Sequence, residues 1–83
     1  MDPRDRQLEE TILALLARTR PGGTICPSDA ARAAGSEADW RELMEAVRQA
    51  AARLVDAGEV EVTQGGRVVD LESAKGPIRI RRA

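Results

Sequence analysis

Apolar residues recur along the first part of the chain at the spacing of amphipathic helices. A first helix is predicted from about Asp5 to Thr19, because its apolar positions fall at i, i+4, i+7 and i+8: Leu8, Ile12, Leu15 and Leu16. The Pro21-Gly22-Gly23 run then ends this helix, since proline lacks a backbone donor and glycine favours turns.

A short strand and a second helix follow. The β-favouring residues Thr24 to Cys26 predict the strand, and Pro27 suits the first position of a helix that stops at Gly35. The apolar face of this helix is predicted to be alanine only: Ala30, Ala31, Ala33 and Ala34. Such small residues let another helix approach closely, as a helix-turn-helix pair requires.

A third and longest helix is predicted to follow Ser36 and to end at Asp56-Ala57-Gly58. Ser36 and Asp39 have the spacing of a capping box with a shortened acid. The apolar residues behind them keep the helical period, and they are Trp40, Leu43, Met44, Val47, Ala51, Leu54 and Val55.

After Gly58 the period changes to two, which is typical of strands. The alternating run Glu59 to Thr63 leads into Gly65-Gly66, a pair suited to a type I′ hairpin turn. A two-residue turn places Val62 opposite Val69 and Val60 opposite Leu71. Residues 72–76 are expected to form a loop. A further short strand is expected over residues 77–81, with Ile78 and Ile80 facing the core and Arg79 and Arg81 facing outward.

This order of elements predicts an α+β, winged helix-turn-helix-like fold: three helices with a short strand, a C-terminal β-hairpin wing and a further short strand. The strand between the first two helices would let the wing pair back onto the body. With 83 residues, the chain is expected to form a single winged-helix-like domain over 1–83.

Composition narrows the classes of function. The chain has no His and a single Cys, Cys26, so neither a metal site nor an internal disulfide is expected. No converging nucleophile, base and orienting group is recognisable, so we expect no enzyme, no cofactor and no small-molecule substrate. No apolar run resembles a signal peptide or a membrane span, so a cytoplasmic location is expected.

Charge is uneven along the chain. Residues 1–64 carry a formal charge of −4 and residues 65–83 carry +3, within a total of −1. A basic tail can meet a nucleic acid or an acidic protein surface. A plain solvated surface is the other reading, because nearly all basic residues are Arg and Ala is abundant, as in GC-rich coding sequences.

The third helix is the one that a winged helix would insert into the major groove. With the wing and the last strand it supplies the candidate nucleic-acid-binding residues: Arg41, Arg48, Gln49, Gln64, Arg67, Lys75, Arg79 and Arg81. Arg and Gln suit base edges and phosphates. Against this reading, Glu42 and Glu45 share the helix surface, where they could instead form local ion pairs with the arginines.

Three further residues or pairs have both a functional and a structural reading. Ser28 and Asp29 could meet a phosphate at a helix start, or simply cap that helix. Cys26 could be a redox sensor or a buried thiol at a strand end. Trp40 could stack on a base, but its spacing favours the core. The structural reading is favoured in each case.

Four runs of sequence resemble a family of small uncharacterised bacterial proteins, known only as a domain of unknown function. They lie at residues 26–32 (CPSDAAR), 40–44 (WRELM), 62–70 (VTQGGRVVD) and 75–79 (KGPIR). The resemblance spans nearly the whole chain and implies a bacterial cytosolic source and a winged-helix-like fold. It implies no activity, ligand or functional residue.

Two functions therefore remain open. The first is DNA binding, as in a small transcriptional regulator, with double-stranded DNA as the partner. The second is a winged-helix module that binds a protein partner or itself without binding DNA.

Overall fold

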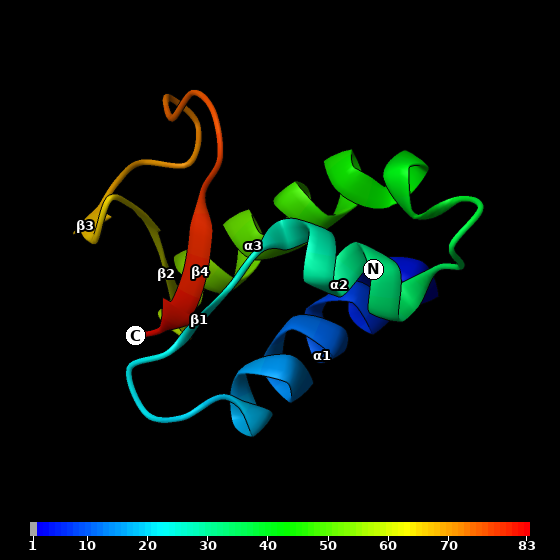
Figure 1. Ribbon diagram of the computed structural model, residues 1–83, viewed down its shortest axis with the longest axis horizontal. Coiled ribbons are helices and arrows are strands. Elements are labelled where there is room, and N and C mark those ends of the chain that lie inside the picture. The colour runs from blue at the N-terminus through cyan, green and yellow to red at the C-terminus, as the bar shows by residue number, and fades with distance from the viewer. Residues whose placement is uncertain (1) are drawn as a thin grey trace.

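The computed structural model describes residues 2–83, so that Met1 of the predicted domain lies outside the described part. Within residues 2–83 the chain forms three α-helices, one 3₁₀ helix and a four-stranded antiparallel sheet (Figure 1). In chain order these are α1 (Pro3–Arg18), β1 (Thr24–Ile25), α2 (Pro27–Ala34), η1 (Trp40–Leu43), α3 (Met44–Asp56), β2 (Val60–Gln64), β3 (Arg67–Val68) and β4 (Arg79–Arg82). The α+β, winged-helix-like fold expected from the sequence is confirmed.

The helices pack on one side of the molecule and the sheet lies beside them (Figure 1). α1 contacts both α2 and α3, and α3 contacts β2. Leu8, Ile12 and Leu16 of α1 are buried at the predicted helical spacing. They meet residues of α3 and the sheet in one core whose other members include Val47, Leu54, Val60 and Ile80. The core therefore joins elements from both ends of the chain.

The strand order is β1-β4-β2-β3, so the last strand lies between the first two. Ile80 of β4 pairs with Ile25 on one side and Val62 on the other. Ile78 and Ile80 are 2% and 0% exposed, which confirms that they face the core. The short strand after α1 was predicted to let the wing pair back onto the body, but it pairs with β4, and the wing is linked to it only through β4.

The wing is only partly as predicted. Gly65 and Gly66 have φ angles of 57° and 82° and form the expected two-residue turn, because Gln64 pairs with Arg67. The expectation that Val60 would lie opposite Leu71 is wrong. β3 ends at Val68, and Val60 pairs with Arg82 of β4. β4 lies on the opposite edge of β2 from β3, so it does not displace Leu71. The backbone N–H of Val69 still donates to the Val62 oxygen at 2.9 Å, as the predicted turn requires, and the hairpin pairing ends there.

The third helix also differs from the prediction of one continuous helix. Its first turn, Trp40–Leu43, is the 3₁₀ helix η1, and the α-helix begins at Met44. In α2, Ala30 and Ala31 are buried as expected, whereas Ala33 is exposed and Ala34 is half-buried. At about 100° per residue, Ala33 lies on the opposite side of α2 from Ala31, and Ala34 is the last residue of the helix.

Candidate interaction site between α3 and the wing

The outer surface of α3 is acidic rather than basic. The buried residues Val47, Ala50, Ala51 and Leu54 define the inner side of this helix. At about 100° per residue, the opposite ridge consists of Glu45, Gln49, Ala52 and Asp56. No arginine lies on this ridge. The element that would read the major groove therefore presents carboxylates where DNA presents phosphates.

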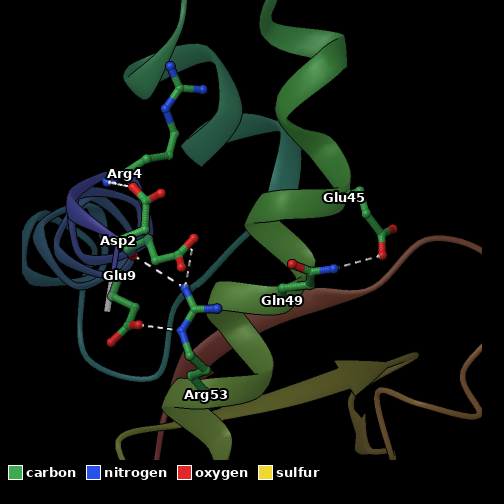
Figure 2. A network of polar contacts seen from close by, with 7 residues as sticks. Asp2, Arg4, Glu9, Glu45, Gln49 and Arg53 are labelled. Carbon is green, nitrogen blue, oxygen red and sulfur yellow. Dashed lines mark hydrogen bonds and ion pairs between the residues drawn. The ribbon is translucent and has the colours of Figure 1, made fainter.

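Arg53, the arginine nearest the C-terminal end of α3, binds to residues of α1. The Arg53 guanidinium lies between α3 and α1, where it donates to the Glu9 carboxylate and to the backbone oxygen of Asp5 (Figure 2). The Glu45 and Gln49 side chains project from another side of the helix (Figure 2). The Gln49 Nε2 atom donates a hydrogen bond to Glu45 Oε1 at a distance of 3.5 Å. The Arg41–Glu45 and Glu45–Arg48 ion pairs considered from the sequence do not form among residues 2–83.

Two candidate DNA contacts, Gln64 of the wing and Arg81 of β4, also bind within the protein. The Gln64 amide donates to the backbone oxygens of Lys75 (2.6 Å) and Pro77 (3.1 Å), so it fastens the end of the wing. Arg81 pairs with Glu61 at 2.9 Å on the outer face of the sheet. The structure thus gives Gln64 and Arg81 structural roles.

Arg79 is held against the start of α2. Its guanidinium donates to the Thr24 hydroxyl at 2.8 Å and contacts the Cys26 sulfur. Cys26 directly follows β1 and is half-buried, so the predicted thiol at a strand end is confirmed in position but only in part in burial. The Asp29 carboxylate accepts the backbone N–H of Cys26 at 2.9 Å, which supports the capping reading of that residue.

The charges of the remaining candidates are not neutralised by a carboxylate within residues 2–83; these candidates are Arg41, Arg48, Arg67 and Lys75. In residues 2–83 their side chains have no hydrogen bond or ion pair. Arg41 does, however, stack on the indole of Trp40, 4.5 Å from the ring centroid. Arg32 of α2 stacks on the same ring at 4.5 Å, a contact that the sequence pattern did not predict. Trp40 packs against the core while remaining half-buried, so the core reading is right only in part.

A groove runs between α3 and the chain that leaves the wing. It consists of two adjoining hollows, of about 370 and 100 Å³, which share Ala52, Leu71 and Glu72. One extends along α3 to Glu45 and Arg48, and the other extends to Val55 and Asp56. We call these two hollows the α3–wing groove. Residues 69–74 form its second wall.

A third hollow, of about 340 Å³, lies beyond the N-terminal end of this groove. Its walls come from the start of α2, from Met44 and from residues 76–78, and Arg48 lines both this hollow and the groove. The wing chain therefore follows the side of α3 from Asp56 back to Met44. This arrangement leaves α3 flanked by protein along most of its length.

Comparison with known protein families places the chain. Residues 5–83 match a family described as "Protein of unknown function (DUF3253)". The chain belongs to the DUF3253 family. The resemblance to a family of unknown function is thereby confirmed, and membership in DUF3253 carries no activity with it. No curated protein matches the chain.

For this DUF3253 protein, Arg48 and Gln49 were candidate residues from the sequence and line the groove, whereas its second wall, residues 69–74, was not predicted. Leu71 was expected to lie in a paired strand and Glu72 in a loop, and neither was predicted to line a groove. The one available signal was an isolated leucine between two acids after the hairpin.

None of the helices in residues 2–83 is both long and apolar enough to cross a membrane.

Proposed function

We propose that this DUF3253 protein is a winged-helix-like module that binds another protein through the α3–wing groove. The observation that carries the proposal is the groove itself, which exposes apolar side chains beside α3. Val55 is 38% exposed there, and Leu71 forms the opposite wall. Hollows that combine apolar walls with charged edges are typical of interaction sites.

The electrostatics of α3 support this choice over DNA reading. Glu45 and Asp56 lie on the ridge that would enter the major groove, and carboxylates there oppose the phosphate backbone. Gln64, Arg79 and Arg81, which were candidates for DNA contact, already bind within the protein. Fold alone does not decide function, so the site has the greater weight.

The test is to fill the groove and measure loss of a partner. Ala52 is half-buried and lines both hollows, so Ala52→Trp fills the centre of the groove. Affinity capture from a lysate of the source cells, quantified by mass spectrometry, should lose its enriched partner with this variant. Ala17→Trp, on the exposed side of α1, is the matched control and should keep the partner. Capture that is unaffected by Ala52→Trp, with the fold intact by circular dichroism, would rule out the groove.

Binding to duplex DNA is the second candidate, favoured by one observation. Arg41, Arg48, Arg67 and Lys75 carry charges with no ion-pair partner in residues 2–83, and Arg48 sits between two hollows. If all these residues contact phosphates, raising salt from about 50 to 200 mM should weaken DNA binding roughly 100-fold. Arg48→Gln and Lys75→Gln should each lower the salt slope by about 0.9, measured by fluorescence anisotropy. Absence of binding at the lower salt concentration would exclude this candidate.

A further inference from the structure

The α3–wing groove has a strongly one-sided charge. Among the residues that line it, the carboxylates are Glu45, Asp56, Asp70 and Glu72, and the one cation is Arg48. Arg48 lies at the end of the groove nearest α2, where it also lines the neighbouring hollow. The part of the groove around Val55 and Leu71 is therefore acidic along its edges.

The carboxylates of the groove, like Glu10 and Glu42 elsewhere in residues 2–83, are not neutralised by an arginine of the same chain. Glu9 and Glu61 are each paired with an arginine of the same chain. By contrast, no acid of the groove forms an ion pair within residues 2–83. Asp70 accepts only the backbone N–H of Glu72 at 3.0 Å, and Glu45 accepts only the long bond from Gln49. Their negative charge is thus left uncompensated at the surface.

Part of the lining of the groove is apolar. Val55 and Val68 are the two large apolar side chains most exposed in residues 2–83, and Val55 lines the groove together with Val69 and Leu71. An apolar side chain inserted here would gain about 25 cal/mol for each Å² that it removes from water. The acids at the edge would then face whatever flanks that side chain.

We infer that the occupant of the groove is a segment of a different protein that carries one or two apolar side chains flanked by Lys or Arg. This inference rests on the proposed protein-binding function and specifies the partner's chemistry. Opposite charges at the edge of an interface guide association and fix register, while the buried apolar contact supplies most of the affinity.

A second copy of the same chain is the alternative occupant, because its hairpin exposes Val68 (57%) beside Arg67, which is unpaired within residues 2–83, and the sedimentation experiment below tests it. The chain's other basic and apolar run is β4 with the residue before it, Ile78 to Arg82. The two isoleucines of that run are 2% and 0% exposed in the core, so they are not available for docking without unfolding. A nucleic acid does not fit the groove, because its phosphates would face unpaired carboxylates.

The inference is tested with three synthetic peptides that share the same apolar residues and differ only in their flanks: Lys/Arg, Glu, or Ser/Gln. Each is titrated into the full-length ¹⁵N-labelled protein and followed by two-dimensional NMR. The basic peptide should shift the backbone amides of residues 52–56 and 69–72. Its affinity should fall as salt rises from about 0.01 to 0.1 M, since the Debye length shortens from about 30 to 10 Å over that range.

Variants separate the charge from the apolar contact. Asp56→Asn and Glu72→Gln should each weaken the basic peptide by about 2- to 5-fold, in the range of exposed ion pairs. Val55→Ser should weaken all peptides that bind. Glu10→Gln, on the exposed side of α1, is the control and should change nothing.

The outcomes distinguish this inference from the proposed function. If the uncharged or acidic peptide shifts the same amides with equal affinity, the groove binds proteins but does not select basic ones, and the inference is wrong. If no peptide shifts these amides, the inference is likewise overturned, while capture with Ala52→Trp still tests the proposed function independently. Concentration-dependent mass by sedimentation, abolished by Ala52→Trp, would identify a second copy as the occupant instead.

Discussion

At the scale of single residues, Asp39 shows how a short polar contact shapes the turn before η1. Its Oδ1 atom accepts the backbone N–H of Ser36 at 2.7 Å and the Ser36 hydroxyl at 2.8 Å. The backbone bond first, and then the hydroxyl bond, lower the pKa of Asp39 below its ordinary value of 3.8, because both stabilise the charged carboxylate.

Replacing Ser36 with Ala should raise the pKa of Asp39 part of the way back toward 3.8, since the backbone donor remains. A carboxylate with a depressed pKa stabilises the fold above the unfolded pKa, and this contribution is lost as pH falls through the folded pKa. The variant should therefore show a weaker dependence of stability on pH below 3.8. Carboxyl-carbon NMR titration measures the pKa directly. An unchanged value would show that the hydroxyl does not matter, and Ser73→Ala, remote in sequence, is the control.

The same pair of residues shows how much of the local structure can be predicted from neighbouring residues in the sequence. The spacing of Ser36 and Asp39 predicted a capping contact, and the carboxylate does return to the Ser36 backbone. The helix that was to follow begins instead as η1, and Arg32 and Arg41 stack on the indole of its first residue, Trp40. Arg32 belongs to another helix, so nothing in the local pattern could indicate this contact.

At the scale of elements, the Gln64 side chain fastens the wing to the chain that returns from it. It lies at the end of β2 and reaches residues 75 and 77 on the return path. This contact helps to position residues 69–74 as the second wall of the α3–wing groove. Gln64 was a candidate for DNA contact from sequence, and its bonds give it a structural role.

Gln64→Glu should loosen this wall, because a carboxylate cannot donate to the two carbonyl oxygens. Each lost hydrogen bond costs about 0.5 to 1.5 kcal/mol, with the lower value expected near solvent. Hydrogen exchange of the backbone amides of residues 70–77 should become faster, while the amides of α1 keep their wild-type rates. Gln49→Glu, whose amide contacts only a nearby side chain, is the matched control. Equal exchange in both variants would contradict the role given to Gln64.

The pairing of the strands marks the limit of prediction from sequence at this scale. The two-residue turn at Gly65-Gly66 was predictable, because both positions need a positive φ. The early end of β3 at Val68 was not, since the alternating pattern continues to Leu71. The pairing of β4 with the other edge of β2 was not predictable either, because β4 arrives from the far end of the chain. The candidate site shares this limit: residue types could be read from the sequence, but their partners are set by long-range contacts.

At the scale of the whole molecule, β4 joins the two ends of the chain into one core. Its residue Ile80 is fully buried, and it pairs with Ile25 of β1 on one side and with Val62 of β2 on the other. The radius of gyration of the Cα atoms, 11.7 Å, agrees with the value of about 12 Å expected for a compact chain of this length. The wing is therefore packed with the helices, and unfolding should be cooperative.

Ile80→Ala tests this dependence on a single buried side chain. Truncation of a buried Ile to Ala typically lowers the free energy of unfolding by about 2 to 5 kcal/mol, and small domains have only about 5 to 15 kcal/mol in total. We expect a large fall in the urea midpoint. Val68→Ala, at a site that is 57% exposed on the same sheet, should stay within about 0.5 kcal/mol of wild type.

Similar midpoints for the two variants would mean that the sheet is not part of the cooperative core. In that case the groove wall carried by residues 69–74 would open independently of the helices, and peptide binding would weaken before the helices melt. Coincident unfolding, followed by circular dichroism for the helices and by NMR for the groove amides, is the result that a single core requires.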